Sequence, residues 1–300
     1  MIDASARTTL APAMTTRPHI LELTEGIKEN RRAAAGMTIV TFLALLAIFA
    51  PYIATNDPIE QHRGHYLQSP SWQYPFGTDD LGRCIFSRLV YGTRISLLIG
   101  ITVVSITAII GTTLGLISGF AGGCVDEAIM RVVDIILAFP GLILALVVAG
   151  LLGPGLFNVM LAMAIVGWSG YARVVRACVL SEKEKGFVEA TKALGSSKRY
   201  IIVHHILPQV LPPVVVMATL GMGGTILSSS ALGFLGLGAQ PPAPEWGSML
   251  NEGRTFLQLA PHCIIFPGIA IMLTVLAFNL LGDGLRDIMD PRQKKKTLEI

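Results

Sequence analysis

The amino-acid sequence predicts an all-α integral membrane protein with six transmembrane helices. Of its 300 residues, 52% are hydrophobic and only 14% are charged, and the mean hydropathy is +0.61. Soluble domains usually carry a charged fraction near one quarter. Several uncharged stretches are long enough to cross about 30 Å of hydrocarbon as helices. The net charge of +3 is modest and the basic residues are scattered at segment ends, which disfavours a nucleic-acid-binding surface.

The chain divides into two tails, one separate span, one large loop and a transmembrane core. Residues 1–32 are mixed polar and charged, too long and too acidic for the start of a cleaved signal peptide, and are predicted to be a cytoplasmic tail. Residues 33–54 are uncharged and form the predicted first span. Residues 55–93 are rich in turn formers and are predicted to be an extracytoplasmic loop. Residues 94–283 form the predicted core, and residues 284–300 a cytoplasmic C-terminal tail.

The second predicted span, Ile95–Val125, has no charge and carries a double small-xxx-small pattern of Gly111, Gly115 and Gly119. This pattern opens one face of a helix to close backbone contact. The three glycines are therefore predicted to pack against another helix, in this chain or in a partner.

The third predicted span, Ala128–Leu152, contains Pro140, which is expected to kink it. Arg131 and Asp134 lie in its first two turns. A charge at mid-bilayer costs about 2.5–3.5 kcal/mol on insertion scales, so we expect the two to pair locally near the inner boundary. The remaining spans are predicted at Leu156–Ala172, Val214–Leu235 and His262–Leu281, with a second outer segment at residues 239–261.

The distribution of Lys and Arg gives the orientation. Of the 23 such residues, 18 lie in the two tails, the turn between the second and third spans, and the region around residues 181–213, while 5 lie in the predicted outer segments. Because Lys and Arg concentrate on the cytoplasmic side of membranes, both termini and residues 181–213 are predicted to be cytoplasmic.

Residues 181–213 are a polar stretch between two long apolar regions, and they are predicted to form a helix–Gly–helix elbow. Gly195 supplies a C-terminal stop for the first helix, and Ser196–Ser197 offers an N-cap for the second. The second helix is predicted to run over Lys198–Leu207 and to end at Pro208.

The first half of this elbow carries a recognisable motif, E-A-T-x-A-L-G, followed after ten residues by I-L-P. It resembles the EAA signature of ABC-importer permeases, the membrane subunits that dock onto a separate ATPase, although Thr191 replaces the second Ala of the name-giving motif. The resemblance implies that the elbow is a coupling helix that binds in a cleft of the ATPase. The implied coupling residues are Glu189, Ala190, Thr191, Lys192, Ala193, Leu194 and Gly195.

More of the chain resembles one branch of that family, the second permease of dipeptide, oligopeptide and nickel importers. The resemblance is carried by residues 76–83 (FGTDDLGR), 87–96, 130–141 and 279–292, in the same order along the chain. It implies a type I ABC-importer permease fold in the bacterial inner membrane. Cys84 stands where the family pattern leads us to expect an Asp, so any contact of that acid is in doubt here.

The resemblance also implies partners: a second homologous permease, two ABC ATPase subunits and an extracytoplasmic solute-binding protein. The chain has no G-x-x-x-x-G-K-[ST] loop, so ATP and Mg²⁺ are expected on the ATPase partners and no cofactor or metal in this chain. A dipeptide or oligopeptide is the preferred substrate. Nickel or another small solute is the alternative, hinted at by His62 and His65.

Two alternatives of other classes stay open at this stage. Gly167–Trp168–Ser169–Gly170 fits the G-x-S-G pattern of an intramembrane serine protease, which would need a histidine within reach of Ser169. A passive channel would leave the elbow unexplained. The predicted topology also puts Cys84 and Cys263 on the same side, which leaves a disulfide between them open.

Overall fold

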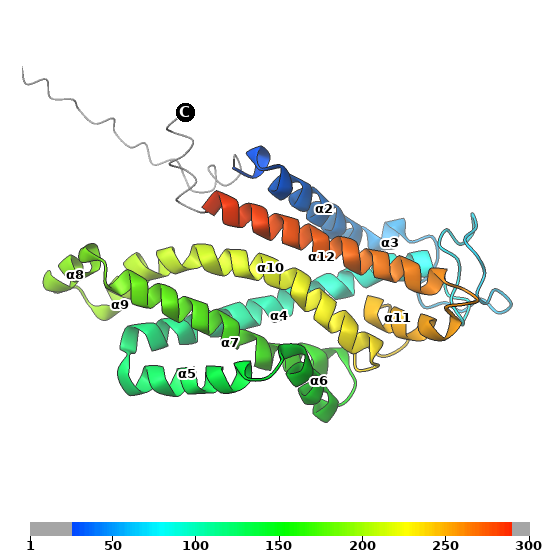
Figure 1. Ribbon diagram of the computed structural model, residues 1–300. Coiled ribbons are helices and arrows are strands. Elements are labelled where there is room, and N and C mark those ends of the chain that lie inside the picture. Colours follow the sequence, from blue (N-terminus) through cyan, green and yellow to red (C-terminus); the bar gives the residue numbers. More distant parts are fainter. Residues whose placement is uncertain (1–25, 290–300) are drawn as a thin grey trace, which may run out of the picture.

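The computed structural model describes residues 26–289, so most of the predicted N-terminal tail and the last 11 residues lie outside it. Within the described range the fold is a bundle of long helices (Figure 1). Five of these helices are long and apolar enough to cross a membrane, and a bent helix pair raises the number to six. The predicted all-α architecture with six spans agrees with this number when the bent pair is counted as one span.

The first span lies along the last one. Helix α2 (Arg31–Ile48) is followed by the short α3 (Ala50–Ile53), and the side chain of Asn30 caps α2 by accepting from the backbone N–H groups of its first turn. A Cβ atom at Gly36 would lie 2.5 Å from the backbone nitrogen of Leu281 in α12 (His262–Met289). The two backbones therefore approach as closely as only glycine permits, which places α2 against α12 (Figure 1).

Helix α4 (Ile85–Ala121) begins ten residues before the predicted Ile95. The end of the predicted outer loop, residues 85–93, is therefore helical. The charges of Arg88 and Arg94 interrupt the apolar run in the sequence. For this reason the first part of the helix was not predicted. In the structure Arg88 is buried and paired with the internal carboxylates of Asp79 and Glu252, so its charge does not oppose helix formation there.

The predicted third span is a bent pair of helices, α5 (Gly123–Leu137) and α6 (Gly141–Leu152), whose axes differ by 89°. The expected kink at Pro140 is confirmed, but the expected continuous span is not.

The local Arg131–Asp134 pair is also wrong. Asp134 accepts from Arg173 of α7 (Leu156–Lys183) at 2.5 Å, and Arg131 lies 3.9 Å from Glu127. Because α5 runs alongside α7, Asp134 forms its ion pair with a cation of the neighbouring helix and not with one of its own helix.

Helix α7 (Leu156–Lys183) packs along α4 and continues beyond the predicted end at Ala172. It leads into the elbow helices α8 (Gly186–Ala193) and α9 (Lys198–Ile201). A π-helical turn, η1 (Ile202–Ile206), then joins α9 to α10 without a break.

Helix α10 (Leu207–Phe234) contradicts the predicted stop at Pro208, because the helix continues through this proline and through Pro212 and Pro213. A proline ring inside an α-helix crowds the carbonyl four residues earlier, here that of His204. The wider π turn η1 contains His204 and lies directly before the proline. It therefore gives the ring room, and the chain stays helical from the elbow into the fifth span.

The second outer segment contains a helix that the sequence did not predict, α11 (Trp246–Gly253), followed by the 3₁₀ turn η2 (Arg254–Phe256). Trp246 is fully buried in a cluster with Ile85 and Met249, and its indole N–H donates to the carbonyl of Leu89 at 3.1 Å. Glu245 caps α11 by accepting from two backbone N–H groups at 2.8 Å, and burial raises the pKa of this carboxyl. The segment folds back onto the bundle between α4, α10 and α12 (Figure 1).

Candidate functional site

The elbow is at the opposite end of the bundle from α11 and the large loop (Figure 1). One side of α8 is anchored to the bundle through Val188, which is fully buried beside Val179 of α7 and Ile201 and Ile206 of the following helix. The sequence marks Val188 as one of several apolar residues at helical spacing in the elbow, and it did not show that Val188 is the one that anchors the helix. The elbow is therefore a packed element with one defined outward face.

The C-terminal end of α8 closes as a Schellman motif. Gly195 has a φ of +81°, and its N–H donates to the carbonyl of Lys192 at 3.0 Å. The N–H of Ser196 donates to the carbonyl of Thr191 at 3.3 Å. This pattern satisfies the last carbonyls of the helix and requires a left-handed residue, which favours glycine. The expected stop at Gly195 and the N-cap at Ser197, which accepts from Tyr200 N–H at 3.2 Å, are both confirmed.

The motif residues form the exposed face of this elbow. Leu194 is 85% exposed, so a large apolar side chain lies at the solvent-facing end of α8. Thr191 is half-buried, and its hydroxyl donates to the carbonyl of Phe187 at 2.7 Å. The other motif residues are exposed: Glu189, Ala190, Lys192, Ala193 and Gly195.

Behind the elbow, α4 and α7 are in close contact along the glycine face predicted from the sequence. A Cβ atom at Gly115 would lie 2.7 Å from the carbonyl oxygen of Ala172, and one at Gly119 would lie 2.7 Å from the Cβ of Val179. Gly111 lies equally close to the backbone of α7. The partner of this face is thus a helix of the same chain.

Two cations tie the α4–α5 turn to the end of α7 just before the elbow. Arg176 donates to both carboxylate oxygens of Asp126 at 2.5 Å, and Ser118 of α4 hydrogen-bonds the same carboxylate. Lys183 donates to the carbonyl of Gly119 at 3.0 Å. The two cation contacts were missed because they join residues 50 and 64 positions apart. They fix the base from which the elbow projects.

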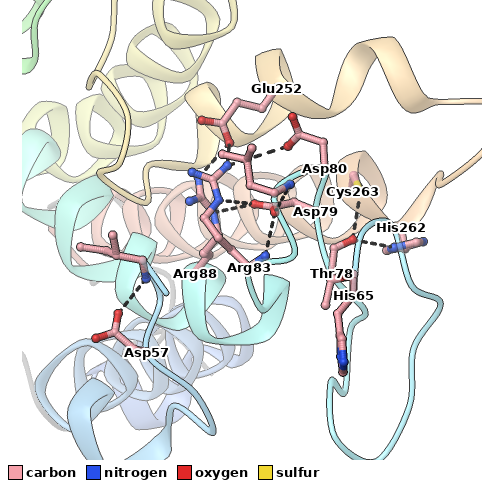
Figure 2. A network of polar contacts seen from close by, with 12 residues as sticks. Asp57, His65, Thr78, Asp79, Asp80, Arg83, Arg88, Glu252, His262 and Cys263 are labelled. Atoms are coloured by element: carbon pink, nitrogen blue, oxygen red, sulfur yellow. Dashed lines mark hydrogen bonds and ion pairs between the residues drawn. The ribbon is translucent and has the colours of Figure 1, made fainter. Parts of the chain in front are cut away.

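The opposite end of the bundle holds a buried network of charges (Figure 2). Arg83 donates to Asp79 at 2.6 Å and to Glu252 of α11 at 2.7 Å, and Arg88 donates to the same Glu252 at 2.9 Å. Both arginine side chains are 1% exposed. Nearby, burial and the charge of Asp79 raise the pKa of Asp80. The network joins the large loop and α4 to α11, so the motif at residues 76–83 holds the outer segments together.

The cysteines and histidines near this network form no crosslink and no metal site. Cys84 and Cys263 are both buried and free, and the thiol of Cys263 lies 3.7 Å from the carbonyl oxygen of Thr78. The rings of His62 and His65 lie 6.3 Å apart. Within residues 26–289 no group of three or more His, Cys, Asp or Glu side chains is arranged to hold a metal ion.

Ser169, the candidate protease nucleophile, is 1% exposed and donates its hydroxyl to the carbonyl of Val166 at 2.9 Å. None of the hydrogen bonds among the described residues joins it to a histidine, which a serine nucleophile needs as its base. The hydroxyl of Ser169 is hydrogen-bonded to a backbone carbonyl of its own helix, as is common for serines in membrane helices.

Comparison with protein families gives two adjoining matches. Residues 111–295 match the family described as binding-protein-dependent transport system inner membrane component. Residues 26–70 match the N-terminal TM domain of oligopeptide transport permease C.

Curated relatives cover most of the chain. It is 50% identical to the dipeptide transport system permease protein DppC of Alkalihalophilus pseudofirmus, over 89% of this chain and 88% of the relative. It is 46% identical to DppC of Haemophilus influenzae, over 89% of this chain and 93% of the relative. It is 44% identical to the glutathione transport system permease protein GsiD of Pectobacterium atrosepticum, over 89% of each.

Among solved structures, the fold is similar to a chain of the MetNI methionine ABC transporter in an inward-facing conformation. The TM-score is 0.56 at 19% identity, over 69% of this chain and 98% of that one. Fold, family matches and relatives agree with the motifs of the elbow and the outer loop. The chain is a multi-pass, non-catalytic inner-membrane permease of the ABC-importer class, and it belongs to the family of binding-protein-dependent transport system inner membrane components.

Proposed function

We propose that this chain forms half of the path of an ATP-driven importer for dipeptides or glutathione, and that its elbow is the surface through which ATPase subunits drive it. The main observation in support concerns α8. Val188 anchors this helix to the bundle, a Schellman motif closes its end, and Leu194 and Ala190 are exposed to solvent. Three large apolar side chains of the elbow are exposed, Phe187 by 45%, Tyr200 by 47% and Leu194 by 85%, and grouped exposed apolar side chains are typical of a protein contact.

The partners are a second permease, two ATPases and an extracytoplasmic binding protein. ATP and Mg²⁺ belong to the ATPases, because this chain has no phosphate-binding loop. Closure of the ATPases on ATP displaces the elbow. Since α9, η1 and α10 form one continuous helix, this displacement reaches the fifth span directly. The two access states of the path then differ in their contacts with the ATPases, as a population shift requires.

The elbow and both termini are proposed to be cytoplasmic, with the large loop and α11 outside. The concentration of Lys and Arg at the elbow end supports this orientation. The buried charge network at the other end then belongs to the face that meets the binding protein.

A dipeptide or glutathione is the proposed solute because two groups of relatives carry these names. Both are small peptides, so they share amide groups and a carboxylate. Nickel is the weaker candidate, since His62 and His65 have no third ligand among the described residues.

Ala190→Trp tests the docking role of the elbow. Ala190 is exposed, so the bulky ring is accommodated in the free subunit but blocks close approach of a partner. The four-subunit membrane complex is purified through a tag on this chain, and the co-purified ATPase is quantified. We expect the variant to reach the membrane with its second permease and to lose the ATPase.

Ala177→Trp is the matched control, because Ala177 is also an exposed helical alanine but lies on α7 before the elbow. It should retain the ATPase. Normal ATPase recovery with Ala190→Trp would show that α8 is an interfacial helix without a coupling role.

A further inference from the structure

A cavity of about 330 Å³ lies halfway along the bundle, between α4, α6, α7 and α10. Its walls include Thr107 of α4, Tyr171 of α7, and Thr225 and Ser228 of α10. None of its lining residues is charged. The volume falls in the range of about 300–1,000 Å³ that is typical of small-molecule sites.

Two hydroxyl groups that α10 contributes to this cavity are available for a ligand. The hydroxyl of Thr107 already donates to carbonyls of its own helix, at 2.9 and 3.1 Å. Thr225 and Ser228 have no hydrogen-bond partner within residues 26–289, although Thr219 and Ser229 of the same helix donate to backbone carbonyls at 2.9 and 3.0 Å. Thr225 and Ser228 are three residues apart, so both point to one side of α10.

The free hydroxyls argue for a polar occupant. A hydroxyl without a hydrogen-bond partner in an apolar environment is unfavourable, because its desolvation is not compensated. A lipid chain in the cavity would leave both hydroxyls unsatisfied, whereas an amide group or water would pair with them.

Glycines open this cavity to one side. Gly224 is exposed, and a Cβ atom at this position would have no neighbour within 4 Å; Gly141 on the opposite wall is also exposed. A Cβ at Gly221 would lie 3.0 Å from the phenol oxygen of Tyr171, so this glycine gives the phenol its place in the wall. The bend at Pro140 turns α6 away from α5 next to the opening. The cavity is therefore accessible from the face of the bundle on which Gly141 and Gly224 lie.

We propose that this cavity is a transit site that binds the main-chain amides of the transported peptide through the hydroxyls of Thr225 and Ser228. The inference rests on the proposed import function and deepens it by naming residues of the path. The absence of charged lining residues suits a site that recognises the amide shared by all peptides and not their side chains. Weak, neutral contacts also let the solute leave, which a transport site requires.

Gly224→Leu tests the cavity directly. The side chain enters open space, so the fold is retained while the cavity is filled. Gly150→Leu on α6 is the control, since Gly150 is also an exposed helical glycine with nothing within 4 Å but does not line the cavity. The complete importer in proteoliposomes is assayed with labelled Ala-Ala. We expect uptake to fall to background for Gly224→Leu and to stay normal for Gly150→Leu.

Removal of the hydroxyls gives a graded readout. Each neutral hydrogen bond contributes about 0.5–1.5 kcal/mol, so Thr225→Val with Ser228→Ala should lower Ala-Ala uptake by roughly tenfold. Unchanged uptake in this double variant, or in Gly224→Leu, would overturn the proposal.

Accessibility separates a solute path from a lipid-filled groove. Ser228→Cys is placed in a background in which the non-buried Cys124 and Cys178 are replaced by serine. A methanethiosulfonate reagent should modify it in the assembled importer, and Ala-Ala should slow the reaction. No reaction would indicate a lipid-facing thiol and would refute the transit site.

Both outcomes are independent of the elbow. ATPase co-purification should be normal for Gly224→Leu, because the cavity is remote from α8. Ala190→Trp should lose the ATPase and therefore uptake, whereas Gly224→Leu should lose uptake and keep the ATPase, so the two proposals are tested separately.

Discussion

The Cβ position of Gly115 on α4 lies 2.7 Å from the backbone carbonyl oxygen of Ala172 on α7. Any side chain at this position would collide with backbone, which cannot rotate away as a side chain can. Close backbone approach through small residues is a main source of helix association in membranes, where the hydrophobic effect does not drive helices together.

Gly115→Leu should therefore separate α4 from α7. We expect a loss of stability of at least the 1–3 kcal/mol that is typical of overpacked sites, seen as lower yield and a lower unfolding temperature in detergent. Gly170→Leu is the control, because a Cβ there has no neighbour within 4 Å. Equal yield and unfolding temperature in the two variants would show that the α4–α7 contact does not hold the bundle.

The orientation of the chain is tested by cysteine labelling in intact cells. Lys192 of the elbow and Trp72 of the large loop are both exposed, and Trp72 fully so. An impermeant maleimide should modify Trp72→Cys and leave Lys192→Cys unmodified until the cells are opened. Labelling of Lys192→Cys in intact cells would show that the elbow lies outside and that the predicted topology is wrong.

The buried charge network should be far more sensitive than surface charges. Arg83→Gln removes one of the two arginines that neutralise Asp79 and Glu252 and leaves Arg88 alone with both carboxylates; breaking a buried pair costs about 3–5 kcal/mol. Arg131→Gln removes an ion pair whose side chains are 72% and 75% exposed, and such pairs contribute about 0–1 kcal/mol. Thermal unfolding in detergent should show a large shift for Arg83→Gln and almost none for Arg131→Gln. Similar shifts would mean that the network is solvated.

Gly195→Val should change the direction in which the chain leaves the C-terminal end of α8, without changing the exposed residues of that helix. A β-branched residue at a φ of +81° is strained, and the cost is about 1 kcal/mol or more relative to glycine. The variant should reach the membrane, lose ATP-dependent uptake and lose solute-stimulated ATP hydrolysis in parallel. Gly186→Val is the control, since Gly186 has open space and no positive φ. Normal coupling in Gly195→Val would contradict a role for the capped end of α8.

Local sequence signals predicted the parts of the fold that depend on local chemistry. The positive φ of Gly195 and the cap by Ser197 follow from turn and capping preferences. The close glycine face of α4 follows from residue spacing alone.

Features that depend on neighbours could not be read in this way. Pro140 indicated a kink, but the 89° turn depends on how α6 packs against α7. Asp134 had a cation one turn away, yet it pairs with Arg173 because α5 lies beside α7. The buried place of Trp246 required the tertiary contact with α4, which a proline-rich, polar segment does not reveal.

The π turn η1 sets the rotational alignment of the helix on its two sides. Ile201 and Ile206 are both buried although they are five residues apart, and Val210 and Val214 continue the buried row at intervals of four. In a regular α-helix, five residues at 100° each would place Ile206 about 140° away from Ile201. The π turn absorbs one additional residue and restores the phase. Deleting one residue from 202–206 would keep the rotational alignment of α10 but would remove the room that the π turn gives Pro208, whereas inserting one would rotate every later side chain by about 100°.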